Sequence, residues 1–285
     1  ELAALLRVRH DQLSVAHRKI AQRVLADSES VAFLTVSEFA AEIGVNEGTI
    51  VRFATGLGLK GYPGLVRLCR ERLRQQAQLL RRFEDLERLA AEGAVPRDRS
   101  LVLDQANLVR SFAAVDAAHW DSAVIGLARA PRVHVLGLRK CHAPAYLLGY
   151  LLGLVREEVV TLSGALGGLP DELRRVRPDD CFVAISIDRY SRDTVRAAEW
   201  AARRGAHVVA LTDTPASPLA ERARDAFYIE AASATVLRSM TAFTAMVQAL
   251  TAEVTHALGH QARDTLLEEE GLLEEFGAYT GYPDD

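Results

Sequence analysis

The sequence predicts two domains of different fold class: an all-α domain at residues 1–95 and an α/β domain at residues 96–285. The first 95 residues read as helical throughout, because their apolar side chains recur at helical spacing. After residue 130, short apolar runs alternate with helical segments, which is typical of a parallel sheet covered by helices on both faces. Between the two patterns, "AAEGAVPRDRS" with Gly93 and Pro96 predicts a linker.

The composition fits a folded chain with two different surfaces. Of the 285 residues, 49% are hydrophobic, enough to bury a sizeable core. The sequence contains no run of about 18 uncharged apolar residues, so it predicts no membrane span. Residues 1–95 carry 14 Lys/Arg and 12 Asp/Glu, whereas residues 96–285 carry 20 and 26, which suggests a different partner for each half. Cys69, Cys141 and Cys181 are scattered, without disulfide or metal spacing, so we expect a reduced, cytoplasmic setting and no metal.

The N-terminal elements predict a helix-turn-helix. Ser14 is a candidate cap for a first helix, and Ser37 is a candidate N-cap for a second helix that runs through Ile43. Gly44 supplies a turn, because glycine tolerates positive φ, and Asn46 can cap the helix that follows. Two helices joined by a short glycine turn, with apolar residues of both at core spacing, form this motif.

A helix-turn-helix places its second helix in the major groove of DNA, with the N-terminal residues of that helix at the base edges. The candidate base readers are Asn46, Glu47, Thr49 and Arg52. Lys60 and Arg67 lie beyond them, where phosphates are usually held. The alternative is that these side chains belong to an ordinary exposed helix.

The C-terminal elements predict a doubly wound, flavodoxin-like domain with a five-stranded parallel sheet. We expect helices at 100–114 and 117–130, followed by strands at 132–138, 157–162, 181–187, 206–212 and 225–230. Helices are expected at 143–155, 193–205 and 217–223, and a long apolar helix closes the domain near 236–258. The acidic end of the chain is either a surface segment or an arm that crosses to another subunit.

The stretch "LTVSEFAAEIGVNEGTIVRFATGLGLKGYPGL" resembles the N-terminal domain of the RpiR family of bacterial transcription regulators. The matching features are the S-E-F-A-A start, the G-V-x-x-x-T-I-V-R-F core and the G-L-K-G-Y-P exit. Gly48, Thr55 and Gly56 depart from the pattern, which bears on the strength or sequence preference of DNA binding.

The second half resembles a sugar isomerase (SIS) domain, in "VHVLGLRKCHAPAYLLGYLLGLV" and "CFVAISIDRYSRDTVRAAEWAARRGAHVVALTDTPASPLA". That resemblance implies binding of a phosphosugar by backbone amides and hydroxyls at loops that open helices, where free N–H groups and a partial positive charge suit a phosphate. Ser191 and Thr194 resemble the Ser and Thr of the SIS motif, and Ser186 ends the preceding strand. Gly137 ends the first strand, at the carboxyl edge where open α/β sheets bind ligands.

The first loop departs from the usual SIS pattern, because Arg139 replaces its second glycine and Cys141 takes the serine position. Arg139 and Arg189 add two cations that can hold a phosphate or carboxylate, or can form ion pairs across the loops. We include Arg139, Cys141 and Arg189 among the candidate ligand-binding residues.

The two resemblances imply a cytoplasmic, ligand-responsive transcription regulator, with repression as the expected outcome. Its expected partners are operator DNA, a small anionic phosphosugar-like metabolite and at least one further copy of itself, with no cofactor, no catalytic residue and no membrane. The alternative is a phosphosugar isomerase with an appended helix-turn-helix domain, for which Glu157, Glu158 and Glu230 are available as bases but stand in no recognisable motif. A nucleotide-binding module is disfavoured because G-x-G-x-x-G is absent after the first strand.

Overall fold

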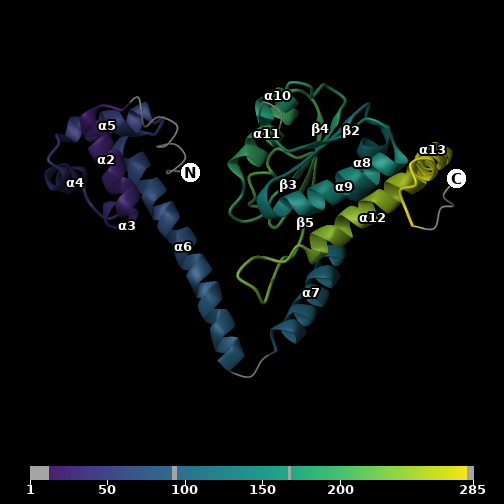
Figure 1. The fold of residues 1–285 in the computed structure, drawn as a ribbon, viewed down its shortest axis with the longest axis horizontal. Coiled ribbons are helices and arrows are strands. Elements are labelled where there is room, and N and C mark those ends of the chain that lie inside the picture. The colour runs from purple at the N-terminus through teal and green to yellow at the C-terminus, as the bar shows by residue number, and fades with distance from the viewer. Residues whose placement is uncertain (1–12, 92–94, 166–167, 281–285) are drawn as a thin grey trace. The chain divides into compact units, whose positions relative to one another are not determined.

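The structure is a computed structural model that describes residues 13–91, 95–165 and 168–280. The chain divides into two compact units, Glu1–Arg88 and Leu89–Asp285, which Figure 1 shows as a helical unit and an α/β unit. Gly93 of the predicted linker lies outside the described residues, and Pro96 is the first residue of helix α7. None of the helices in these ranges has a stretch long and apolar enough to cross a membrane.

The N-terminal unit is helical, as predicted. Its helices are α2 (Val15–Ala26), α3 (Ser28–Val31), α4 (Val36–Ile43), α5 (Glu47–Gly56) and α6 (Gly61–Ala91), the last of which runs past the division between the units. They enclose one apolar core, in which Phe39, Ile50, Phe53 and Leu65 are fully or almost fully buried. The Tyr62 ring stacks on Phe39 with ring centroids 6.0 Å apart. Its hydroxyl donates to the Leu34 carbonyl at 2.9 Å, which ties α6 to the chain before α4.

Helices α4 and α5 form the predicted helix-turn-helix. Gly44 ends α4 with φ of 66°, a left-handed conformation that costs glycine little, so the predicted turn is confirmed. The predicted caps at Ser14 and Asn46 are also confirmed, because their side chains accept hydrogen bonds from the His17 and Thr49 amides.

The predicted N-cap at Ser37 is wrong, because α4 is capped two residues earlier by Thr35. The Thr35 hydroxyl accepts from the Glu38 amide at 3.2 Å, and the Glu38 carboxylate accepts from the Thr35 amide at 2.7 Å. This reciprocal capping box needs an acid three residues after the cap. Ser37 has Ala40 at that position, so it cannot complete the same pair.

The C-terminal unit alternates helices and strands around one sheet. Its helices are α7 (Pro96–Ala113), α8 (Ala117–Arg129), α9 (His142–Val155), α10 (Leu169–Leu173), α11 (Arg192–Arg203), α12 (Thr241–Leu258) and α13 (His260–Glu275), with a 3₁₀ turn η2 (Arg139–Cys141). Its strands are β1 (Val133–Gly137), β2 (Val159–Leu162), β3 (Cys181–Ile185), β4 (His207–Thr212) and β5 (Asp225–Tyr228).

Within the described residues the five strands form a single parallel sheet in the order β2-β1-β3-β4-β5. This order confirms the flavodoxin-like prediction. One face packs on α8, α9 and α12 through Val135, Val183 and Leu211, and the other packs on α11 through Leu136, Phe182 and Ala210. Successive strand residues point to opposite faces, and helices cover both, so the strands read as continuous apolar runs.

Two predicted helices differ from the structure. Residues 217–223 form turns and not a helix, in which the Ala220 and Arg222 amides donate to the carbonyls three residues earlier and the Ala223 amide donates to the Leu219 carbonyl. The buried Ser217 hydroxyl lies 2.7 Å from the Thr212 hydroxyl and accepts from the Leu219 amide at 3.3 Å. The closing helix begins at Thr241 and not near 236. The hydroxyls of Ser233, Thr235 and Ser239 bond to nearby backbone and so compete with helical hydrogen bonds.

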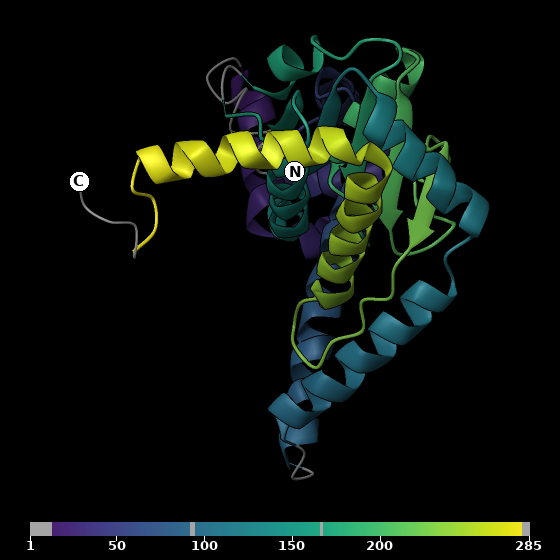
Figure 2. The ribbon, with the colours of Figure 1, turned by 90° about the vertical axis from the view of Figure 1, so that its right-hand side faces the viewer.

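The acidic C-terminal region, left open by the sequence, contains a helix. Figure 2 shows α13 turning sharply away from the end of α12 at Gly259, whose φ is 55°. Helix α13 packs against α9 and α12 of the same chain. Residues 281–285 of the acidic end lie outside the described residues.

Candidate functional site

The exposed face of α5 carries the predicted base-reading residues. Ile50, Phe53 and Ala54 fix the buried face of this helix in the core. Arg52 is exposed on the opposite side, and its guanidinium donates to the Thr49 hydroxyl at 3.2 Å. Asn46 and Glu47 are exposed at the N-terminal end of the helix, so the four predicted residues share one end of one helix.

The two predicted phosphate contacts lie just beyond α5. Lys60 is exposed before α6 begins, and Arg67 is exposed on the second turn of α6. The neighbouring Arg70 has a structural contact instead, because its Nε donates to the Ala32 carbonyl at 2.9 Å and so joins α6 to the end of α3. Sequence reasoning did not distinguish these arginines, since all lie in one basic stretch.

The carboxyl edge of the sheet carries the predicted ligand-binding residues. After β1, the chain turns so tightly that a Cβ on Gly137 would lie 2.2 Å from the Cys141 carbonyl oxygen, so only glycine fits. Arg139 opens η2, is exposed and has φ of 58°. Cys141 instead points inward, because it is 3% exposed within the core cluster, and burial raises the pKa of its thiol.

The loop after β3 is built around hydroxyl groups. The buried Ser186 hydroxyl accepts from the Ser191 amide at 3.1 Å, and the half-buried Ser191 hydroxyl caps α11 by accepting from the Thr194 amide at 3.4 Å. Thr194 is fully buried, and its Oγ1 is one of three buried side-chain polar atoms in the described residues without a hydrogen-bond partner. Arg189 is exposed, with φ of 65°.

Sequence reasoning missed a second set of polar groups at this edge. Asp213 directly follows β4, and its carboxylate accepts from the Asp188 amide at 3.0 Å and the Tyr190 hydroxyl at 2.8 Å. Burial, with the Asp213 carboxylate next, raises the pKa of Tyr190. The Thr212 hydroxyl donates to the Ser186 carbonyl at 2.8 Å. The position of Asp213 at the end of a strand was the available signal, since ligands of open α/β sheets bind at this edge.

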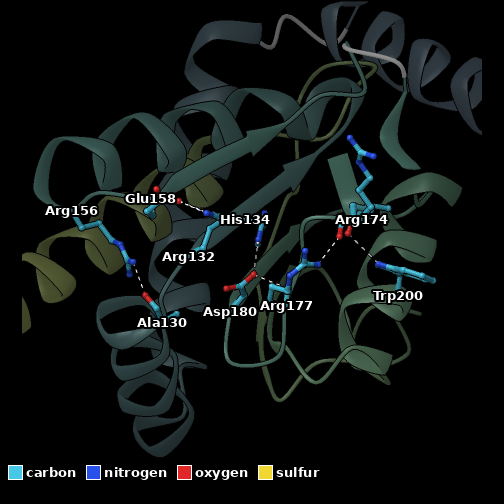
Figure 3. A network of polar contacts seen from close by, with 10 residues as sticks. Ala130, Arg132, His134, Arg156, Glu158, Arg174, Arg177, Asp180 and Trp200 are labelled. Atoms are coloured by element: carbon cyan, nitrogen blue, oxygen red, sulfur yellow. Dashed lines mark hydrogen bonds and ion pairs between the residues drawn. The ribbon is translucent and has the colours of Figure 1, made fainter. Parts of the chain in front are cut away.

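The amino edge of the sheet carries a separate polar network, part of which Figure 3 shows. Buried His134 on β1 bonds the Asp180 carboxylate at 3.0 Å, and burial lowers the pKa of this histidine despite that hydrogen bond. Arg132 pairs with Glu158 at 2.6 Å, and buried Arg156 donates to the Leu127 and Ala130 carbonyls at the end of α8.

Two hollows of about 510 and 810 Å³ lie beside this network, where α8 ends, with Arg129 and Ala130 lining both. They are at the opposite edge from the hydroxyl groups of the β3–α11 loop, so volume alone does not locate a phosphate site. In the described ranges no three His, Cys, Asp or Glu side chains are grouped to hold a metal ion.

Comparison with known proteins assigns both units. Residues 1–75 match the model of the helix-turn-helix domain of the rpiR family, and residues 126–254 match the SIS domain. The chain belongs to the RpiR family. It is a helix-turn-helix transcriptional regulator with a SIS domain, which confirms the resemblance found in its sequence.

The similar relatives of this RpiR-family chain include two curated bacterial regulators. It is 25% identical over 224 residues to the HTH-type transcriptional regulator HexR of Pseudomonas aeruginosa, which is 74% of this chain and 73% of the relative. It is 25% identical over 230 residues to the uncharacterized HTH-type transcriptional regulator YfhH of Escherichia coli, covering 78% and 79% of the two chains.

Solved structures share the fold of this RpiR-family chain. The sugar isomerase domain of an RpiR transcription factor from Sphaerobacter thermophilus is 29% identical with a TM-score of 0.58, over 61% of this chain and 97% of that one. The NanR protein of Vibrio vulnificus, complexed with ManNAc-6P, is 19% identical with a TM-score of 0.53, over 97% of this chain and 99% of that one. At that identity the second likeness concerns the fold alone.

Proposed function

We propose that this regulator is a repressor whose operator binding is controlled by a phosphosugar-like anionic metabolite bound at the carboxyl edge of its SIS sheet. The observation that carries the proposal is the start of α11, where the Ser186, Ser191 and Thr194 hydroxyls lie around a helix N-terminus. Free N–H groups and the positive end of the helix dipole suit a phosphate. Gly137, Arg139 and Arg189 complete the proposed site from the neighbouring loops, whereas Cys141, included on the sequence alone, points into the core and is left out.

The DNA-binding part of the proposal rests on the exposed end of α5. Arg52 bonds bidentately to a guanine, Asn46 and Thr49 contact neighbouring bases or phosphates, and Glu47 accepts from a cytosine amine. Lys60 and Arg67 hold the backbone. Because operators of such proteins are two-fold, the regulator acts as a homo-oligomer of at least two copies, in the cytoplasm.

The positions of the carboxylates favour a regulator over an isomerase. Isomerisation needs a base placed at the sugar. Glu157 and Glu158 lie at the amino edge of the sheet, the opposite edge from the proposed site. Glu230 follows β5 at the carboxyl edge, but it is exposed, and its amide is held by the Ser111 hydroxyl at 2.9 Å. Of these three, Glu230 is therefore the one at the edge of the proposed site, and its side chain is exposed.

The deciding experiment combines DNA and metabolite binding. An operator is selected from random duplexes, and Arg52→Ala is compared with Arg97→Ala, an exposed arginine of the other unit. Loss of a base contact should weaken specific binding by about 1–3 kcal/mol in Arg52→Ala alone. Unchanged specific affinity would remove Arg52 from the proposal.

The metabolite is sought among glucose 6-phosphate, fructose 6-phosphate, N-acetylmannosamine 6-phosphate and 6-phosphogluconate. We expect one of them to raise the melting temperature and to change operator affinity. Conversion of any of them by the wild-type protein, followed by NMR at catalytic protein concentrations, would instead support the isomerase.

A further inference from the structure

The loop between β5 and α12, residues 229–240, is the feature from which we draw a further inference, and we call it the β5–α12 loop. It leaves the sheet at the carboxyl edge, since β5 ends at Tyr228. Its base is closed by a hydrogen bond from the Ser239 amide to the Ala231 carbonyl at 3.2 Å.

One side of the β5–α12 loop reaches the proposed metabolite site. Arg238 Nη2 lies 3.7 Å from the Asp188 carboxylate, in the loop that leads into α11. At that distance the pair is an ion pair without a close hydrogen bond. Arg238 Nε is buried and has no hydrogen-bond partner among the described residues, which places a donor at this loop without an acceptor.

Thr194 Oγ1, in the first turn of α11, has the same property. Two of the three unsatisfied buried side-chain atoms in the described chain therefore belong to residues at the β3–α11 loop: Thr194 in the first turn of α11, and Arg238, which pairs with Asp188 of that loop. Unsatisfied buried polar groups call for an explanation, such as an ion or ligand that binds there. An anion bound at the start of α11 is the kind of acceptor that both groups lack.

The other side of the β5–α12 loop is locked to α7. The buried Asn107 amide bonds both backbone groups of Ala232, donating to its carbonyl at 2.7 Å and accepting from its N–H at 3.1 Å. The buried Ser111 hydroxyl accepts from the Glu230 amide at 2.9 Å. Thr241, at the start of α12, donates to Asp104 of α7 at 2.9 Å.

Helix α7 is the first helix after α6 in the chain, and α6 begins in the DNA-binding unit. A displacement of the β5–α12 loop therefore acts on the helix of the C-terminal unit that stands nearest in the chain to α6. Coupling of two sites requires an element whose position both sites can bias, and this loop contacts the metabolite site at Arg238 and α7 at Ala232.

We infer that Arg238, which pairs with Asp188, is a further metabolite-binding residue, and that the β5–α12 loop passes its displacement to α7. This inference rests on the function proposed above. Binding of the anion breaks the ion pair between Arg238 and Asp188, and the β5–α12 loop moves with Arg238. The hydrogen bonds of Asn107 and Ser111 to this loop transmit the movement to α7. A metabolite shifts the equilibrium between two arrangements of the loop only if it binds them with unequal affinity. The affinities differ because Arg238 contacts the anion in one arrangement and Asp188 in the other.

The first test concerns binding, measured by calorimetry with the sugar phosphate of the panel that gives the largest thermal shift. Arg238→Gln should weaken that binding about ten- to hundredfold, the effect expected for a lost hydrogen bond to a charged group. Asp188→Asn should strengthen it, because it removes the competing carboxylate. Arg222→Gln, an exposed arginine that pairs with Glu221 and Glu199, is the matched control and should bind like wild type.

The second test concerns coupling and includes an arm without metabolite. Asp188→Asn frees Arg238 and should change operator affinity in the same direction as the sugar phosphate does in wild type. Asn107→Ala, or the milder Thr241→Val if the first variant is unstable, should abolish the change in operator affinity, both when it is combined with Asp188→Asn and when sugar phosphate is added. The sugar-phosphate affinity of these variants should stay within about threefold of wild type, since neither residue lies in the metabolite site.

The outcomes separate the two proposals. If no panel compound binds wild type, the phosphosugar assignment fails. The operator affinities measured without metabolite then still test whether the β5–α12 loop couples Arg238 to α7. Equal operator affinity in wild type and Asp188→Asn would then overturn it, and a change that Asn107→Ala abolishes would support it. If a compound binds, equal affinity in wild type and Arg238→Gln, or a full operator response in both Asn107→Ala and Thr241→Val, would overturn it.

Discussion

At the scale of the residue, the Thr194 hydroxyl separates a binding role from a structural one. Because Oγ1 has no partner in the described structure, Thr194→Val should leave the unfolding free energy unchanged or slightly raised. Binding of the active sugar phosphate should fall about ten- to hundredfold, since hydrogen bonds to charged groups contribute about 1.5–3 kcal/mol. Calorimetry and denaturant unfolding measure the two effects. Thr265→Val on α13, away from the carboxyl edge and with a hydroxyl that donates to the Gln261 carbonyl at 3.1 Å, is the control for sugar-phosphate binding. Equal sugar-phosphate affinity in wild type and Thr194→Val would show that the Thr194 hydroxyl is not a ligand.

A second residue-scale prediction concerns pH and the buried carboxylate Asp225. It accepts from His119 at 2.8 Å, His207 at 2.6 Å and Ser122 at 2.9 Å. The hydrogen bond to Asp225 raises the pKa of His119, so the stability it contributes is complete below the unfolded pKa, about 6.5, and is lost as pH rises through the folded value. Burial raises the pKa of Asp225, but the three hydrogen bonds outweigh it and the net pKa is lowered, so this contribution is lost as pH falls below about 4.

We therefore expect the C-terminal unit of wild type to lose more stability between pH 6 and 9 than that of His119→Gln. Trp120 and Trp200 are the two tryptophans of the chain and both lie in this unit, so denaturant unfolding followed by tryptophan fluorescence reports on it alone. His256→Gln, an exposed histidine on α12, serves as the control. Parallel stability curves for wild type and His119→Gln would contradict the pairing.

At the scale of the element, the capping box of α4 fixes where the helix-turn-helix begins. Thr35→Ala removes the acceptor for the Glu38 amide and should destabilise the N-terminal unit by about 1 kcal/mol. Hydrogen exchange of the α4 amides should accelerate accordingly. The tryptophan transition of the other unit should not move, and it is the internal control. Ser37→Ala should have little effect, and a larger loss there than in Thr35→Ala would reverse the assignment of the cap.

At the scale of the whole molecule, we expect a dimer formed through the SIS domain. Exposed apolar side chains lie on α9 and α13, which pack together, and include Tyr146, Tyr150 and Leu267, with Phe276 directly after α13. Light scattering of the full chain should give at least twice its 31.2 kDa. Leu267→Glu should raise the dissociation constant about tenfold or more, because burying a charge costs over 1.4 kcal/mol. Val15→Glu, equally exposed in the other unit, should not. A monomer at about 10 µM wild type would refute the prediction.

Local signals decided most of the secondary structure. Asn46 and Gly44 were readable because a cap and a left-handed turn depend on residues within a few positions in the chain. In the two departures, residues 217–223 and 236–240, hydroxyls bond to nearby turn or loop backbone, as Ser217 does to the Leu219 amide and Thr235 to the Leu237 carbonyl, and such local bonds compete with a helix.

The sequence by itself determined the family, the helix-turn-helix and the order of the parallel sheet, because these follow from periodicity, turn chemistry and motif. Only the tertiary structure decided that Thr194 is buried without a partner, that Cys141 points into the core and that Arg238 faces Asp188. Asn107 and Ala232 lie 125 residues apart in the chain, yet two hydrogen bonds join them. Such contacts are absent from any local pattern, because the packing of α7 against α12 brings them together.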